Sequence, residues 1–295
     1  MSATTARTGA GTGAIARTTA TAPRQGQGRG RGWLGNNGVM IYGLLVLLYM
    51  FLPIFVVVLM SFNAPRSRLG YNFDGFTLNN WTHLCDPYQL CSSVGTSLKI
   101  GLLATLLATI LGSLMAFAMV RHYFRGRGTA NLLIFLPMAS PEIVLGSSLL
   151  ALFVNANLAG RLGFWTIFIA HVMFCLSFVV ITVKARLVGL DPALEQAAAD
   201  LYANEWQTFW RVTFPLVIPG IISAALLSFS LSFDDFIITN LNAGQTVTFP
   251  MFVWGAAQRG VPMQVNVIGT IMFLLALTLV LGTAVVRRVR DRAPA

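Results

Sequence analysis

Most of the chain consists of long apolar stretches separated by shorter polar segments. Six of these stretches have the length of about 20 residues that a helix needs to cross the hydrocarbon of a bilayer. Their apolar residues are continuous rather than alternating, which is typical of membrane helices and not of membrane-barrel strands. We therefore predict an all-α membrane protein with six transmembrane helices. The predicted spans cover about 39–61, 96–120, 130–154, 164–184, 216–238 and 267–286.

The two ends of the chain lack this pattern. Residues 1–35 are rich in Thr, Ala, Gly and Arg and show no apolar periodicity, so we expect a disordered basic tail. Residues 36–288 form the predicted six-helix domain, and a short tail covers 289–295. Within the domain, a long polar loop lies at about 185–216.

Charge adds the orientation of the chain in the membrane. The composition is 56% hydrophobic and only 10% charged, as expected where long segments lie in lipid. The net charge of +10 could indicate a nucleic-acid partner, but 15 Lys and Arg residues lie on the side of both termini and 5 on the other. The positive-inside rule therefore places both termini and the long loop in the cytoplasm. The excess of basic residues therefore indicates the orientation of the chain in the membrane, and we expect no nucleic-acid partner.

The third predicted span contains two prolines and a carboxylate in the segment LPMASPEIVLG. Pro137 and Pro141 each remove a helical hydrogen bond, so we expect this helix to bend or break near the middle of the membrane. Glu142 follows directly. A carboxylate at that depth is costly and marks a functional site by default.

The fifth predicted span ends in two adjacent carboxylates, Asp234 and Asp235, near its external end. Adjacent helical residues point about 100° apart, so we expect one to line a path and the other to cap or anchor the helix end. With Glu142 they would suit a cationic substrate such as a polyamine, whose ammonium groups are spaced along an apolar chain. The alternative is that the acids pair internally or lie in solvent.

The second predicted span carries small residues at four-residue spacing: Ala104, Ala108, Gly112 and Ala116. Such a stripe lies on one helix face and lets another backbone approach closely. It would pack either inside one helix bundle or against a second subunit. In the fourth span, His171 is expected to be a packed, hydrogen-bonded polar residue rather than a proton relay.

The chain shows no catalytic or metal-binding pattern of its own. Cys85 and Cys91 flank an external loop where a disulfide is possible, and two unpaired thiols are the alternative. No His, Cys and carboxylate spacing resembles a metal site, and no nucleophile motif is present. The two lysines, Lys99 and Lys184, do not belong to a P-loop. We expect no enzymatic activity and no cofactor in this chain, so any ATP and Mg would be bound by another chain.

The long cytoplasmic loop contains a short amphipathic helix. Asp191 and Pro192 are typical of a helix start. Apolar positions then recur every three or four residues, at Leu194, Ala197, Ala198 and Leu201. We expect this exposed apolar face to dock onto a partner. A helix lying on lipid is the alternative.

This loop resembles that of the transmembrane permease subunits of ATP-binding-cassette importers, whose pattern is Glu-Ala-Ala, three residues, Gly, nine residues, Ile-x-Leu-Pro. The matching positions here are Gln196, Ala197, Ala198, Tyr202, Val212, Phe214 and Pro215. Four of these positions depart from the pattern, while the spacing and the final proline hold. Gln for Glu removes a possible salt bridge to the partner, although Glu195 is adjacent. Tyr for Gly puts in doubt the sharp turn that glycine allows.

The resemblance implies that the loop is a coupling helix that inserts into a cleft of an ATPase subunit. The residues expected at this contact are Glu195, Gln196, Ala197, Ala198, Asp200, Tyr202 and Pro215. The resemblance covers about 39–286, and the segments SPEIV (140–144) and SFDDF (232–236) are most similar to permeases of the spermidine/putrescine type.

The same resemblance implies a type I importer permease fold in the inner membrane of a prokaryote. The implied partners are a second permease subunit, an ATPase dimer and an extracytoplasmic solute-binding protein, and the implied function is polyamine import. Two alternatives stay open. The substrate could be another small solute, such as thiamine, ferric ion, a phosphonate or a sugar. A self-powered secondary carrier would leave the exposed alanine-rich loop unexplained.

Overall fold

The computed structural model describes residues 33–67 and 72–290. Across these residues the regular structure is helical, apart from an isolated bridge between Asn63 and Phe76. The predicted all-α class is therefore confirmed. Most of the predicted tails, 1–32 and 291–295, lie outside the described residues. The chain divides into two compact units, 1–52 and 53–295.

The described part of the first unit is the N-terminal part of α1 (Trp33–Ser61). The predicted tail extends to residue 35, but the helix already begins at Trp33. From Gly38 to Ser61 the helix is long and apolar enough to cross a membrane, and its most apolar window has no buried residue. A helix that is apolar on all sides is typical of a membrane span.

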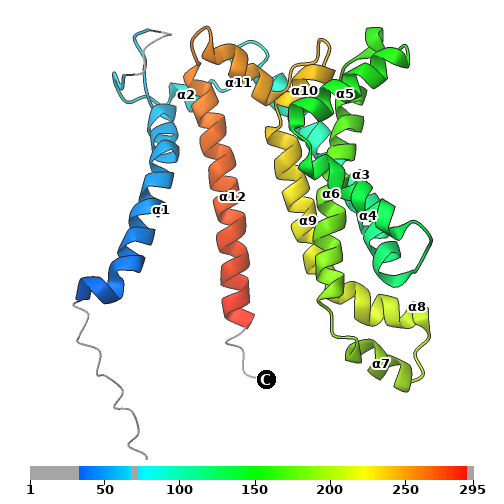
Figure 1. Cartoon of the computed structure of the whole chain (residues 1–295). Helices are drawn as coiled ribbons and strands as arrows, with labels where there is room; N and C mark the ends of the chain where they lie inside the picture. The colour runs from blue at the N-terminus through cyan, green and yellow to red at the C-terminus, as the bar shows by residue number, and fades with distance from the viewer. Residues whose placement is uncertain (1–32, 68–71, 291–295) are drawn as a thin grey trace, which may run out of the picture. The chain divides into compact units, whose positions relative to one another are not determined.

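The second unit holds the remaining helices (Figure 1). The helices before the long loop are α2 (Asn79–Thr82), α3 (Leu90–Arg121), α4 (Arg127–Ala139), α5 (Glu142–Asn155), η1 (Ala159–Arg161) and α6 (Phe164–Val188). Those in and after the loop are α7 (Ala193–Asp200), α8 (Glu205–Thr208), the π-helix η2 (Phe209–Thr213), α9 (Phe214–Asp234), α10 (Ile237–Asn242), α11 (Phe249–Ala257) and α12 (Met263–Arg290).

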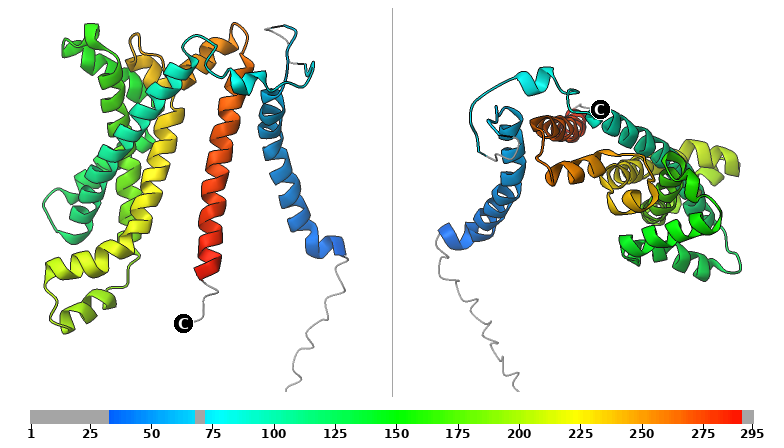
Figure 2. Two further views of the ribbon diagram at one scale, coloured as in Figure 1. Left: turned by 180° about the vertical axis from the view of Figure 1, so that it is seen from behind. Right: turned by 90° about the horizontal axis from the view of Figure 1, so that it is seen from above.

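The core of the second unit lies where α3, α6 and α9 pack against one another (Figure 2). Ala104, Ala108 and Ala116 of α3 are fully buried there. An added Cβ at Gly112 would lie 2.7 Å from Cγ1 of Val179 in α6. The small-residue stripe therefore packs inside this bundle, and its alternative placement against a second subunit is wrong.

The third predicted span is broken as expected. α4 and α5 meet at an angle of 109° across residues 140–141. The break is at Pro141 and not at Pro137, which lies inside α4. A proline disfavours the helical conformation of the residue before it. Ser140 is accordingly extended, with φ −81° and ψ 139°.

Among the described residues, four helices are long and apolar enough to cross a membrane, or five if α4 and α5 form one bent span. The sixth predicted span corresponds to α12, of which Met263–Thr278 is the described apolar part. The fifth predicted span extends to 238, but α9 ends at Asp234, where the extended backbone of Asp235 interrupts the helix, and α10 begins at Ile237. The count of six spans stays a prediction.

The close approach at Gly112 gives the first prediction. Gly112→Ala should destabilise the protein by about 1–3 kcal/mol, because the new methyl group overlaps Val179. Gly95→Ala is the matched control, since no atom lies within 4 Å of a Cβ added at this position of the same helix. Thermal unfolding in detergent should show a lower melting temperature for Gly112→Ala alone. Equal melting temperatures would contradict the packing described here.

Candidate functional site

The long polar loop begins with a capped helix, as predicted. Oδ1 of Asp191 accepts a hydrogen bond from the backbone N–H of Ala193 over 2.9 Å, and α7 starts immediately after Pro192. No residue of α7 is buried. Leu194 is 46% exposed and Leu201 81%. The predicted apolar face is thus formed, and Leu194, Ala197 and Leu201 on it are exposed while Ala198 is half-buried.

Glu195 braces this helix against the membrane bundle. Its carboxylate forms an ion pair with Arg121, the last residue of α3, and accepts a hydrogen bond from Oγ1 of Thr213 over 2.6 Å. The hydrogen bonds from Arg121 hold the pKa of the Glu195 carboxyl below its usual range, so the pair stays ionised at neutral pH. Glu195 therefore turns inward, while Gln196, Ala197 and Asp200 stay exposed.

Tyr202 forms the sharp turn after α7, although the family pattern has glycine at this position. Its φ of +59° is left-handed, the conformation that glycine adopts at a helix C-terminus. The N–H of Ala203 donates to Ala198 O and that of Tyr202 to Ala199 O, at 3.1 and 2.9 Å. These two bonds define a Schellman cap. The tyrosine side chain is 97% exposed at the tip of the loop.

The predicted membrane acids divide into two kinds. Asp235 is 8% exposed, and its Oδ2 accepts hydrogen bonds from the N–H and hydroxyl of Thr239, at 2.7 and 2.8 Å. It anchors the start of α10. Asp234 and Glu142 are exposed instead. The expectation that one of the two adjacent aspartates caps a helix end is confirmed for Asp235.

Asp235 belongs to a buried polar network around His171, which is 1% exposed. The histidine Nδ1 lies 2.7 Å from Oγ of Ser232, and its Nε2 lies 2.8 Å from Oγ1 of Thr239. Because the Thr239 hydroxyl donates to Asp235, it accepts from Nε2–H of His171. The expected role of His171 as a packed, hydrogen-bonded residue is confirmed.

The same region brings Glu142 near the two aspartates. α5 packs against α10, where a Cβ added at Gly146 would lie 2.8 Å from Leu241 Cδ1. Nδ2 of Asn242 donates to the carbonyl of Gly146 over 3.2 Å. Glu142, at the start of α5, is within electrostatic range of Asp235 and Asp234. The second half of the broken third span therefore packs against α10, the helix that follows α9.

Sequence reasoning missed two members of this region, Thr239 and Asn242. Thr239 lies four residues after Asp235, and Asn242 lies three residues after Thr239. A helix that begins after the aspartates would therefore have placed all three on one face. They were missed because the fifth span was predicted to continue to 238, and α10 is a separate helix.

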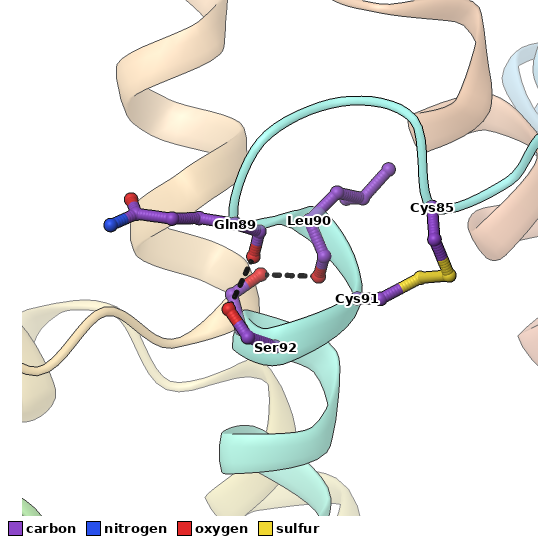
Figure 3. Close-up of a disulfide and its surroundings, with 6 residues drawn as sticks. Cys85, Gln89, Leu90, Cys91 and Ser92 are labelled. Carbon is purple, nitrogen blue, oxygen red and sulfur yellow. Dashed lines mark hydrogen bonds between the residues drawn. A yellow bond between two sulfur atoms is a disulfide. The ribbon is translucent and has the colours of Figure 1, made fainter.

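At the other end of α3, a disulfide joins Cys85 and Cys91, with Cα atoms 5.3 Å apart (Figure 3). Gln89 is left-handed at φ +66°, and its carbonyl accepts from the Ser92 hydroxyl. This loop lines one side of a cavity of about 910 Å³, and α11, the start of α12 and the segment between them form most of the other walls, together with Pro65 and Asn80. α3 has 32 residues, so the cavity and the coupling helix are about 48 Å apart along it.

The fold and the site define a helical membrane protein that presents a braced amphipathic helix at one end of its bundle. Residues 108–292 match the family described as the inner membrane component of binding-protein-dependent transport systems. The chain belongs to this family, whose members are permease subunits of ATP-binding-cassette importers.

Curated relatives cover most of the chain. The spermidine/putrescine transport system permease protein PotC of Haemophilus influenzae is 36% identical over 241 residues, which are 81% of this chain and 92% of that protein. PotC of Escherichia coli K12 is 35% identical over 81% of this chain and 90% of its own length. The putrescine transport system permease protein PotI of the same strain is 35% identical over 76% of this chain and 81% of its own length.

Solved structures share the fold at low sequence identity. A chain of a bacterial alginate ABC transporter in complex with an alginate-bound periplasmic protein has a TM-score of 0.64 at 16% identity, over 89% of this chain and 98% of that one. A chain of the MetNI methionine ABC transporter has a TM-score of 0.54 at 14% identity, over 70% of this chain and 97% of that one. The predicted importer-permease fold is confirmed.

The left-handed turn gives the second prediction. Tyr202→Gly should stabilise the cap of α7 by about 1 kcal/mol, because glycine adopts positive φ without the Cβ penalty. Amide hydrogen exchange over residues 201–203 should then be roughly fivefold slower. Tyr202→Ala is the matched control, since it removes the ring and keeps the Cβ. Equal exchange in the two variants would show that this turn carries no strain.

Proposed function

We propose that this chain is the permease subunit of a polyamine importer driven by ATP that a partner chain hydrolyses. It would cross the prokaryotic inner membrane six times, with both termini in the cytoplasm. The observation that carries the proposal is α7, an exposed amphipathic helix braced by Glu195 and Arg121 at the end of a membrane bundle of this family. The names of the PotC and PotI relatives supply the substrate class.

The proposed coupling runs from α7 into the bundle. A partner ATPase that moves α7 also moves Arg121, at the end of α3, and Thr213, which leads directly into α9. α9 ends at Asp234, and α10, which follows it, packs against α5. ATP binding and hydrolysis on the partner would thus open and reset the path. A second permease subunit would supply its other half, and a solute-binding protein would deliver the substrate.

The acids fit a cationic substrate, with one correction to the predicted set. Asp235 is committed to Thr239 and His171 inside the protein, which leaves Asp234 and Glu142 as the exposed carboxylates. Two carboxylates near the break of one span and the end of another suit a diamine that passes in an extended form.

Reconstitution tests the proposal directly. The chain would be placed in liposomes with a second permease, the ATPase and the solute-binding protein, and ATP hydrolysis would be measured with each solute. Putrescine or spermidine should stimulate hydrolysis, while thiamine, ferric ion, phosphonates and sugars should not. Stimulation by one of these solutes and not by polyamines would overturn the substrate class. Uptake without any ATPase would favour a secondary carrier.

The coupling face gives the third prediction. Ala198→Glu should lower polyamine-stimulated uptake at least tenfold, because it places an unpaired carboxylate in the apolar contact, at a cost of at least about 1.4 kcal/mol. Ala199→Glu is the matched control, since it makes the same change on the same helix outside the predicted apolar face. Equal uptake by the two variants would remove this face of α7 as the docking site.

The path acids give the fourth prediction. Asp234→Asn and Glu142→Gln should each reduce polyamine uptake roughly fivefold, the effect of about 1 kcal/mol of lost cation stabilisation, without lowering protein yield. Asp235→Asn should instead lower the yield and melting temperature, because it disturbs a buried acceptor of hydrogen bonds. Normal uptake by both Asp234→Asn and Glu142→Gln would contradict a cation path through these residues.

A further inference from the structure

An aromatic stripe follows the coupling helix. Trp206, Trp210 and Phe214 recur at four-residue spacing, and Phe209 lies between them. The ring centroids of Trp206 and Trp210 are 5.6 Å apart, and those of Trp210 and Phe214 are 4.9 Å apart. Phe209 also contacts Phe117 of α3, at 5.3 Å. One side of the stripe is thus packed against the bundle.

The other side of the stripe is uncovered. Trp206 is 70% exposed and Trp210 46%, although indole rings carry a large apolar area. The exposed tip of α7, at Leu201 and Tyr202, lies on a different element and a separate turn. The stripe therefore needs an occupant of its own.

The position of α8 and η2 identifies that occupant. Both helices lie across the end of α9 in Figures 1 and 2, instead of continuing its direction. α9 alone has 21 residues, about 31 Å, which already spans the hydrocarbon. Phe117 of α3 contacts the stripe, and it lies four residues before Arg121, the last residue of α3. The stripe therefore lies at the end of the bundle where α3 ends and the membrane-length α9 begins.

Two exposed arginines lie near the same end of the bundle. Arg211 is exposed within η2, and the exposed Arg186, near the end of α6, donates from Nε to the carbonyl of Leu216 over 3.1 Å. Exposed tryptophans with nearby arginines match the lipid headgroup layer, where a ring can place its apolar body in lipid and its N–H in water. Anionic headgroups attract the arginines.

We propose that Trp206 and Trp210 insert into the headgroup layer of the bilayer, so that lipid covers the open side of the aromatic stripe. This anchor sets the depth of α8 and η2 in the membrane. Because α7 packs against both, the anchor also fixes the height of the coupling helix. The inference rests on the chain being a membrane protein of this family and does not require the proposed substrate or ATPase contact.

Depth-dependent tryptophan quenching tests the anchor. The full chain would be reconstituted in liposomes, and the signal would be its fluorescence minus that of the Trp206→Phe/Trp210→Phe variant. Lipids brominated near the headgroup should reduce this signal roughly twofold more than lipids brominated near the chain ends. Aqueous acrylamide should quench it weakly. When the fluorescence of the single variant Trp206→Phe is subtracted instead, the difference signal should be smaller but should be quenched in the same way.

The matched control places an indole on the loop tip. Tyr202→Trp in the double-variant background should be quenched strongly by acrylamide and not by brominated lipid, because residue 202 is 97% exposed beyond the stripe. Strong acrylamide quenching of Trp206 and Trp210 without lipid quenching would overturn the proposal. Protection from acrylamide that appears only after the ATPase is added would overturn it too, and would assign the stripe to the ATPase contact. Neither result depends on transport activity.

Discussion

The close packing of α3 against α6 is the constraint on which the rest of the second unit depends. In a membrane the two helices gain little from excluding water, so their association relies on contact between well-fitted surfaces. Gly112 and the flanking alanines allow that contact because they place no group larger than a methyl on this face of α3. α9 packs against both helices. The ion pair of Arg121 with Glu195 and the disulfide between Cys85 and Cys91 then lie at opposite ends of α3.

The polar residues of the bundle follow from this scaffold. Where α9 stops, the first backbone N–H groups of α10 have no helical partners and would be costly to bury. Asp235 accepts from two of them, and His171 and Ser232 complete the buried network from the core helices. The interruption that ends α9 therefore has partners for two of the N–H groups that it frees, and Asp234 lies exposed next to Asp235.

Local sequence rules predicted the features that depend on single residues. Pro141 breaks its helix, Asp191 caps α7, and His171 is packed and hydrogen-bonded, all as expected. The sequence predicted that the two aspartates have different roles. It could not assign the roles to Asp234 or Asp235, because the assignment depends on which carboxylate faces Thr239 of a separate helix. The inward turn of Glu195 depends on Arg121, 74 residues away, which no local pattern contains. The π-helix at Phe209–Thr213 has no signal in the apolar periodicity.

The departures of the coupling loop from the family pattern are consistent with one another. Glutamine at 196 leaves a neutral exposed position, and the one acid that could replace it, Glu195, is held by Arg121 and Thr213. The stiffness of α7 therefore comes from contacts inside this chain rather than from a charge shared with a partner. Tyr202 adopts the backbone of the missing glycine and adds an exposed ring. A cleft complementary to this surface would need to accommodate the exposed carboxylate of Asp200 on α7 and an aromatic side chain at the tip of the loop.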